Sequence, residues 1–197
     1  MPRSFIILVV VAGVLGVLIG SFLNVVAYRV PAKVSLLRES RCPHCDTAIR
    51  PWQNVPVVSW IALRGRCANC KAPISARYPI VEAATGVAFA VVALWGLTST
   101  GVTTGEVLTT AQAWAAAIVI VAYLCFAAIS IVLTLIDLDT HRLPNSIVLP
   151  SYVVAGILFT AAAGLTGEWS QLLVAGIGMA ALYLFYFLLR AARPGGM

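Results

Sequence analysis

Charged side chains are scarce in this sequence. Lys, Arg, Asp and Glu together make up 10% of the 197 residues, whereas soluble domains carry about 25%. Hydrophobic residues make up 61%, and the mean hydropathy is +0.97. A chain of this length leaves much of its surface exposed, and so few charges cannot cover that surface in water. A water-soluble globular enzyme is therefore excluded, as is intrinsic disorder, which requires low hydrophobicity and high charge.

Acidic residues are the rarer charged type, and the basic residues are unevenly distributed. The sequence has seven Asp and Glu against thirteen Lys and Arg, a net charge of +6. Nine of the thirteen basic residues lie between Arg29 and Arg77, together with only two acids, Glu39 and Asp46. A basic patch can bind nucleic acid, but in a membrane protein it is more typical of a loop on the cytoplasmic side. We therefore expect a cytoplasmic loop and no nucleic-acid partner.

Long apolar runs are abundant. A helix needs about 20 mostly apolar residues to cross the hydrocarbon core, and five stretches meet this requirement, at residues 5–27, 80–97, 111–136, 147–165 and 172–189. The basic start resembles a signal peptide, but no small-x-small cleavage site follows, which favours an uncleaved span. The predicted fold class is an all-α polytopic membrane protein with about five transmembrane helices. Residues 1–27 form the first helix, 28–79 a small loop domain and 80–197 a membrane domain.

The basic residues also predict how the chain crosses the membrane. If the five spans alternate in direction, the loop domain, the connection over residues 137–145 and the C-terminus share one side. That side holds twelve of the thirteen Lys and Arg, including Arg193, and leaves Arg3 on the other. The positive-inside rule identifies it as the cytoplasm. We therefore expect a multi-pass protein of the cell membrane with its N-terminus outside and the loop domain in the cytoplasm.

Four of the five cysteines lie in the loop domain. Cys42 with Cys45, and Cys67 with Cys70, form two Cys-x-x-Cys pairs that are separated by twenty-one residues. Each pair can point two thiolates at one centre, and two pairs complete a tetrahedral site, which predicts structural zinc. Two disulfides are the main rival, but they are rare in a reducing cytoplasm, and another metal or thiol redox chemistry also remains open. We expect Cys125, alone in the third span, to be a packing residue.

A second polar cluster follows the third apolar run. Asp137 comes directly after that run, and ionisable residues at this depth are candidates for function, although helix ends are normally polar. On a helix, Asp137 and Asp139 lie about 200° apart, so they cannot act as a pair while the helix continues. Asp137 and His141 share a face, which leaves a metal site open as an alternative. If Asp137 acts as in aspartic proteases, whose two close carboxylates share one proton, it needs a second carboxylate from elsewhere.

Four further segments, at residues 20–31, 50–60, 74–82 and 136–145, occur in order around the cysteine pairs. Together these motifs resemble the type IV prepilin leader peptidase family. The resemblance implies a membrane aspartic endopeptidase that cleaves prepilins or pseudopilins after the Gly of a basic leader at the cytoplasmic face. Many members also methylate the new N-terminus with S-adenosylmethionine. Asp137 matches the first catalytic aspartate of the family, and the four cysteines match its metal-binding domain.

One part of the family pattern is missing. The second catalytic aspartate of the family lies in a Gly-x-Gly-Asp motif, which does not occur in this sequence. Glu106 and Glu168 are expected on the opposite side of the membrane, and the family does not use Glu82 as the partner. We therefore expect a truncated representative, the N-terminal part of the peptidase domain, that is inactive alone. The alternatives are a non-catalytic membrane scaffold whose zinc knuckle docks a partner, and an ion or proton carrier that uses Asp137 and Glu82.

Overall fold

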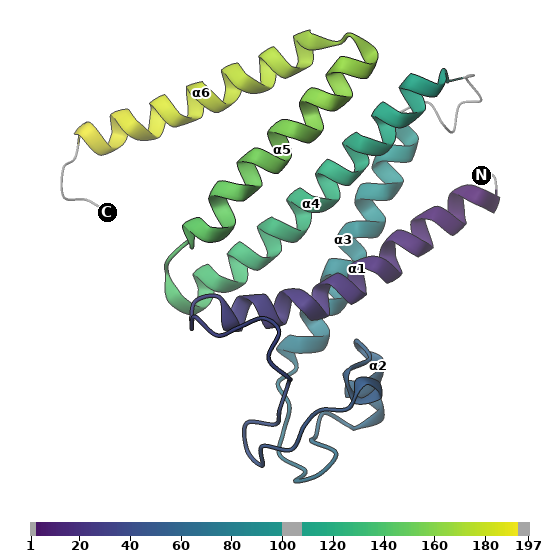
Figure 1. Ribbon diagram of the computed structural model, residues 1–197, viewed down its shortest axis with the longest axis vertical. Helices are drawn as coiled ribbons and strands as arrows, with labels where there is room; N and C mark the ends of the chain where they lie inside the picture. The colour runs from purple at the N-terminus through teal and green to yellow at the C-terminus, as the bar shows by residue number, and fades with distance from the viewer. Residues whose placement is uncertain (1–2, 100–107, 193–197) are drawn as a thin grey trace.

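The computed structural model describes residues 3–99 and 108–192. Within those ranges the chain is helical, with no strand beyond two isolated bridges. Five of the helices are long and apolar enough to cross a membrane. They are α1 (Arg3–Arg29), α3 (Arg77–Ser99), α4 (Thr110–Thr140), α5 (Asn145–Thr166) and α6 (Trp169–Ala192). The predicted fold class is confirmed (Figure 1). Glu106, in the expected connection over residues 98–110, and Arg193 lie outside the described residues.

The ends of α4 explain where the polar cluster lies. Thr109 and Gln112 form a capping box at its start, in which the amide of Gln112 donates to Thr109 Oγ1 over 3.3 Å. The helix continues for one turn beyond the expected residue 136 and ends at His141, whose φ of 52° is left-handed. Asp137 and Asp139 are therefore both helical, and the separation expected for them on a helix applies.

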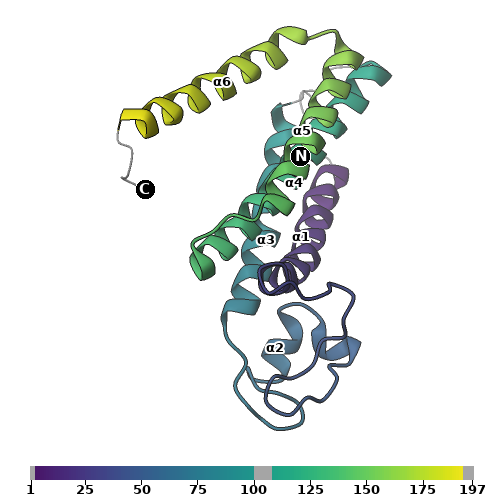
Figure 2. The same cartoon turned by 60° about the vertical axis from the view of Figure 1, so that its left-hand side comes forward.

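Helices α1 and α3 pack closely because small residues line their contact. A Cβ atom on Gly16 would lie 2.7 Å from the Cβ of Phe89, and one on Gly20 would lie 2.8 Å from the Cα of Glu82. Small residues let two membrane helices approach at backbone distance. In Figures 1 and 2, α4 lies beside α3 and α5 beside α4, while α6 extends away from the other helices. No residue of α6 is buried.

The hydrophobic core sits where α1 ends, α3 begins and α4 ends. Its buried members come from these three helices and are Leu23, Val26, Ala27, Val81, Val132, Leu135 and Ile136. Ile136 is only 1% exposed. Val132, Leu135 and Ile136 form the buried face of α4 here, and Asp137 lies about 100° further round the helix than Ile136, at the surface.

The loop domain lies at this same end of the helices (Figure 1). It contains a short 3₁₀ helix, η1 (Pro51–Asn54), and the one-turn helix α2 (Val58–Ala62). Helix α3 begins at Arg77, three residues earlier than expected. Pro79 is tolerated there because the amides of a first helical turn have no intrahelical acceptor.

Candidate active site and metal centre

The first cysteine pair lies in a tight backbone turn. The amide of Cys42 donates to the carbonyl of Thr47 over 3.0 Å, and the amide of Asp46 donates back to the carbonyl of Cys42 over 2.9 Å. An antiparallel bridge between Arg41 and Ala48 closes the turn. Asp46 has a φ of 50°, which directs the chain back so that both thiols of the pair face inward.

The second cysteine pair repeats the same turn, each contact lying 25 positions later in the chain. The amide of Cys67 donates to the carbonyl of Ala72 over 2.8 Å, and that of Lys71 donates to Cys67 over 3.1 Å. Lys71 again has a positive φ, of 61°. We did not predict this repeat from the sequence, although its signal is visible there as Arg-Cys-x-x-Cys-x-x-x-Ile, which occurs twice.

The two turns bring the four predicted ligands together. The sulfur atoms of Cys42, Cys45, Cys67 and Cys70 all lie within 4.8 Å of one another, and those of Cys42 and Cys70 are 3.8 Å apart. A tetrahedral zinc site with Zn–S bonds of about 2.3 Å has S–S edges of about 3.8 Å. All five cysteines are free, since a disulfide requires about 2.05 Å. The donor set and its spacing therefore fit one tetrahedral metal ion.

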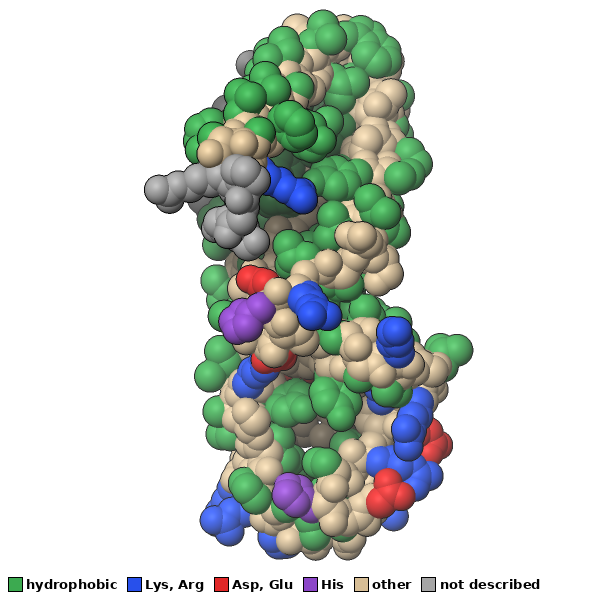
Figure 3. Space-filling model, turned by 90° about the vertical axis from the view of Figure 1, so that its left-hand side faces the viewer, with side chains coloured by type: hydrophobic (Ala, Val, Ile, Leu, Met, Phe, Trp, Pro, Cys, Tyr) green, Lys and Arg blue, Asp and Glu red, His purple; other side chains and the backbone are tan. Residues whose placement is uncertain are grey.

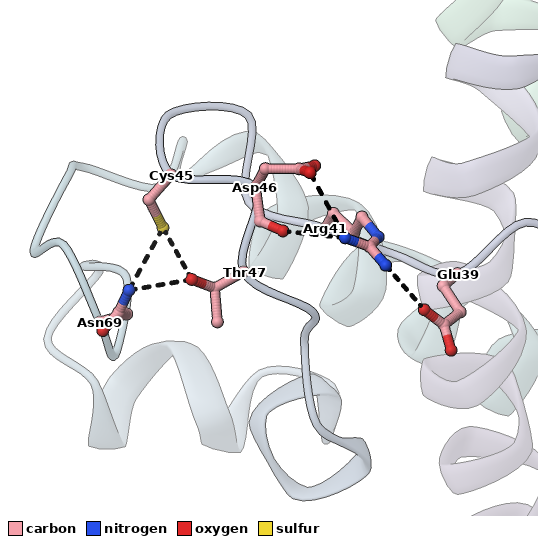
Figure 4. Close-up of polar contacts among 6 residues, drawn as sticks. All are labelled: Glu39, Arg41, Cys45, Asp46, Thr47 and Asn69. Atoms are coloured by element: carbon pink, nitrogen blue, oxygen red, sulfur yellow. Dashed lines mark hydrogen bonds and ion pairs between the residues drawn. The ribbon is translucent and has the colours of Figure 1, made fainter.

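The thiols of Cys45 and Cys70 differ in pKa because their polar neighbours differ. The hydrogen bonds of Thr47 to the sulfur, through its side chain and backbone, lower the pKa of Cys45 to about 6. Asn69, from the other turn, donates to Thr47 Oγ1 over 2.9 Å and to Cys45 Sγ over 3.7 Å (Figure 4). For Cys70 the amide of Ala72 favours the thiolate, but desolvation and the three neighbouring thiols outweigh it and raise the pKa to about 11.

The acids of the loop domain are paired with a single arginine. Arg41 Nη1 lies 3.3 Å from Asp46 Oδ2, and Arg41 Nη2 lies 3.4 Å from Glu39 Oε2 (Figure 4). All three side chains are well exposed, so these pairs contribute little to stability. Both the Glu39 and the Asp46 carboxylate therefore have Arg41 as an ion-pair partner.

A buried carboxylate joins the loop domain to the membrane helices. Glu82 of α3 is 7% exposed and accepts a 2.6 Å hydrogen bond from the amide of Val57. Val57 has a φ of 59°, an unfavourable conformation for a β-branched residue. The Glu82 carboxylate is thus the hydrogen-bond acceptor for the Val57 amide, which lies in the strained turn before α2. This contact spans 25 residues, and no local sequence pattern predicts it.

A buried guanidinium holds the chain that leaves α1. Arg29 is 8% exposed, and its Nη1 donates to the carbonyls of Ser35 at 3.2 Å, Leu36 at 2.9 Å and Arg38 at 2.5 Å. Its Nη2 reaches Ser40 Oγ at 3.3 Å. We expected Arg29 only as one of the basic residues of the loop; it also fixes the shape of that loop.

Asp137 and Asp139 differ sharply in their surroundings. Arg77 binds Asp139 with two hydrogen bonds of 2.7 Å and also donates to the carbonyl of Leu135 at 3.3 Å. Asp137 is exposed, and within the described ranges its carboxylate makes no ion pair or hydrogen bond. The two acids do not meet, and around Asp137, Asp139 and His141 the described residues form no metal-ligand group of the kind found at the cysteines.

A pocket of about 200 Å³ opens between the ends of the three core helices. Its polar lining comes from Asn24, Tyr28, Ser75, Arg77, Tyr78 and Asp139. Asn24 is buried, and its Nδ2 donates to the carbonyl of Tyr78 over 3.3 Å. Asp137 does not line this pocket. Figure 3 shows most of the charged side chains of one face over the loop domain and the adjoining helix ends, with hydrophobic side chains beyond them.

These features define a class of protein: a multi-pass membrane protein whose four-cysteine domain is docked beside a free carboxylate at a helix end. Two family models match the chain, the bacterial peptidase A24 N-terminal domain over residues 14–95 and the type IV leader peptidase family over residues 124–197. The chain belongs to the type IV leader peptidase family, as the order of its motifs led us to expect.

Curated relatives agree with this assignment. A prepilin leader peptidase/N-methyltransferase of Neisseria gonorrhoeae is 37% identical over 88% of this chain and 63% of its own length. The corresponding protein of Stutzerimonas stutzeri is 37% identical over 76% of this chain and 53% of its own length. A type 4 prepilin-like proteins leader peptide-processing enzyme of Escherichia coli is 36% identical over 82% and 57%. The chain thus spans about 53–63% of these relatives. No solved structure matches it.

Proposed function

We propose that this chain forms the metal-binding domain and the first catalytic carboxylate of a membrane aspartic endopeptidase. Its substrates are the leader peptides of type IV prepilins or pseudopilins, which are cleaved after Gly at the cytoplasmic face of the cell membrane. The catalytic residue is Asp137. The alternative, a non-catalytic scaffold that docks a partner through its cysteine domain, uses the same fold without that residue.

The observation that carries this proposal is the isolation of Asp137. Every other described acid at this end of the molecule is engaged: Glu39 and Asp46 with Arg41, Glu82 with the amide of Val57, and Asp139 with Arg77. Glu168 lies in the turn between α5 and α6, at the opposite end of the helices (Figure 1). Among the described acids near the cysteine domain, Asp137 alone has a carboxylate with no hydrogen-bond or ion-pair partner.

The chemistry follows from two carboxylates that share a proton. The ionised carboxylate takes a proton from water while the water oxygen bonds to the scissile carbonyl carbon, and the protonated carboxylate donates its proton to the carbonyl oxygen. The tetrahedral intermediate then collapses, the C–N bond breaks, and the leaving amine takes up a proton. Asp137 supplies one carboxylate. Asp139 cannot supply the other, because it faces a different way and is held by Arg77.

A chimera tests this function. Residues 1–192 are joined to the C-terminal part of the Neisseria gonorrhoeae relative that follows the matching region, and membranes containing the chimera are mixed with a prepilin that has a Gly–Phe junction. We expect cleavage that Asp137→Asn abolishes and that Glu39→Gln, at an acid remote from the reaction, leaves unchanged. Cleavage by the Asp137→Asn chimera would remove Asp137 from the mechanism, and an inactive parent chimera would favour the scaffold. Residues 1–197 alone are expected not to cleave.

We further propose that the metal is one structural Zn²⁺ bound by Cys42, Cys45, Cys67 and Cys70. Four protein ligands leave no open coordination position, so this ion would organise the domain and take no part in peptide cleavage. N-methylation of the new N-terminus with S-adenosylmethionine is also part of the proposal, on the strength of the relatives' names. We assign that cofactor no residues, because the 200 Å³ pocket is smaller than the sites of about 300–1,000 Å³ that enclose ligands of its size.

The proposed orientation places the cysteine domain and Asp137 in the cytoplasm and the N-terminus outside. The structure supports it by putting the basic cysteine domain and the end of α4 on the same side. Alkaline phosphatase fused in the connection at Glu168 should be active, because it would fold in the oxidising exterior, whereas fusion at Arg142 should be inactive. The opposite pattern would strand Asp137 outside and contradict the peptidase proposal.

A further inference from the structure

Two leucines are exposed to solvent in the turn that follows α1. We call residues 33–38 the leucine turn. Leu37 is 97% exposed and Leu36 is 41% exposed. Leu37 is the most exposed of the large apolar side chains in the described ranges. An apolar environment beside the turn would remove this leucine surface from water, and the described residues do not supply one.

The leucine turn is rigidly built. The guanidinium of Arg29 binds the carbonyls on both sides of Leu37, those of Leu36 and Arg38. The amide of Leu37 donates to Ser35 Oγ over 3.3 Å, and that of Arg38 donates to the carbonyl of Ser35 over 3.3 Å. A buried charge and a closed turn therefore fix the direction in which the two leucines point.

The position of the turn indicates what covers it. Helix α1 crosses the membrane and ends at Arg29, four residues before the leucine turn begins, and Val30 still packs against the hydrophobic core. In Figures 1 and 2 this part of the chain lies where the helices end and the cysteine domain begins. The headgroup layer begins where the hydrocarbon ends, and the turn begins four residues after the end of α1, so we place the turn in this layer.

The charges beside the leucines favour an anionic surface. Lys33 and Arg38 flank them and are exposed, and in the described ranges neither side chain forms an ion pair with an acid. Glu39, the nearest acid, is paired with Arg41. Apolar side chains beside unpaired bases are the composition of segments that lie in the interface of an anionic leaflet.

We propose that the leucine turn is a lipid anchor: Leu36 and Leu37 insert among the acyl chains next to the first span, and Lys33 and Arg38 contact anionic headgroups. The anchor tethers the root of the cysteine domain to the membrane surface. This inference depends only on the protein being embedded in a membrane and is independent of the peptidase proposal.

Photo-crosslinking tests the anchor. The full chain with Leu37→p-benzoylphenylalanine is placed in nanodiscs of phosphatidylglycerol and phosphatidylcholine, irradiated and analysed by mass spectrometry. The matched control is Ile61→p-benzoylphenylalanine, on α2 of the same domain, where the native side chain is 63% exposed. We expect lipid adducts at position 37 and few at position 61. Adducts to protein in place of lipid, no adduct at position 37, or equal lipid adducts at both positions would overturn the proposal.

The role of Lys33 and Arg38 is tested separately, in the protein that carries p-benzoylphenylalanine at position 37. Lys33→Gln and Arg38→Gln should each lower the lipid adduct by up to about fivefold in anionic discs, the contribution of one base near such a surface. Both should have no effect in discs of phosphatidylcholine alone. Thermal unfolding that matches the parent shows that the variants are folded. Adduct yields that ignore both the bases and the lipid charge would overturn the assignment of an anionic surface. If the position-37 protein does not fold, the same crosslinker at Leu36 replaces it with the same expected results.

Discussion

Arg77 and Asp139 are joined by a two-pronged ion pair, Nη1 to Oδ1 and Nη2 to Oδ2, each at 2.7 Å. Arg77 is the first residue of α3 and follows the second cysteine turn closely, while Asp139 lies two residues after Asp137 on α4. The pair therefore links the root of the cysteine domain to the helical turn that carries the proposed catalytic carboxylate. Because it turns Asp139 toward α3, it leaves Asp137 directed about 200° away.

Loss of this pair should weaken both stability and cleavage. The two side chains are 42% and 41% exposed, so solvent screening limits the contribution to about 1 kcal/mol. We expect Arg77→Gln and Asp139→Asn each to destabilise the protein by about that amount in thermal unfolding. In the chimera, each should lower kcat by about fivefold with little change in KM, because Asp137 is displaced while the substrate is still bound.

The double variant provides the control for this prediction. If the two residues act through each other, Arg77→Gln with Asp139→Asn should be no worse than Arg77→Gln alone, which also loses the bond to the carbonyl of Leu135. The coupling energy should then be close to the effect of Asp139→Asn. Additive losses would show that each residue acts separately. A change in KM alone would assign the pair to substrate binding instead of positioning.

Close packing of α1 against α3 makes Gly20 a sensitive position. The added Cβ of Gly20→Ala would lie 2.8 Å from the Cα of Glu82 and 2.9 Å from Thr85 Oγ1, so the helices must move apart. Overpacking of this kind costs about 1–3 kcal/mol. The matched control is Gly176→Ala on α6, where nothing lies within 4 Å of the added atom. Chemical unfolding in detergent should separate the two, and equal stability would refute the close contact.

Removal of the Glu82 carboxylate should loosen the loop domain. Glu82→Ala leaves the amide of Val57 without its acceptor, and a hydrogen bond to a charged group contributes about 1.5–3 kcal/mol. Hydrogen exchange at Val57 should therefore accelerate by about tenfold or more. Glu82→Gln keeps an acceptor oxygen and should show a smaller change. If Val57 exchanges at the parent rate in the Ala variant, another group holds this turn.

Metal binding should follow the four clustered cysteines and not the fifth. We expect one zinc ion per chain by elemental analysis, loss of that ion in Cys42→Ser and Cys67→Ser, and its retention in Cys125→Ser. A strong chelator should expose the segment between residues 40 and 76 to protease while the helices stay intact, because the turns fold around the ion. Zinc retained without Cys42 or Cys67 would contradict the tetrahedral arrangement.

Several of these elements could be predicted because their signals are local. A span needs only enough consecutive apolar residues, a cysteine turn needs two thiols at a fixed spacing, and the separation of Asp137 from Asp139 follows from the helical period. The contacts of Arg77, Glu82 and Arg29 could not be predicted in the same way. Those of Arg77 with Asp139 and of Glu82 with Val57 join residues 62 and 25 positions apart, and each depends on how neighbouring helices are rotated.

That rotation has a physical origin that the sequence by itself does not reveal. Helices that are apolar on every side carry no polar stripe to show which face packs inward, so composition and spacing determined the five spans, the cysteine turns and the helix end that carries Asp137. Only the tertiary structure determined which residues Arg77 and Glu82 contact. The narrow glycine face of α1 lets α3 approach closely, and that approach buries Glu82 against the loop domain. With the α3–α4 packing it also places Arg77 beside Asp139, which leaves Asp137 free.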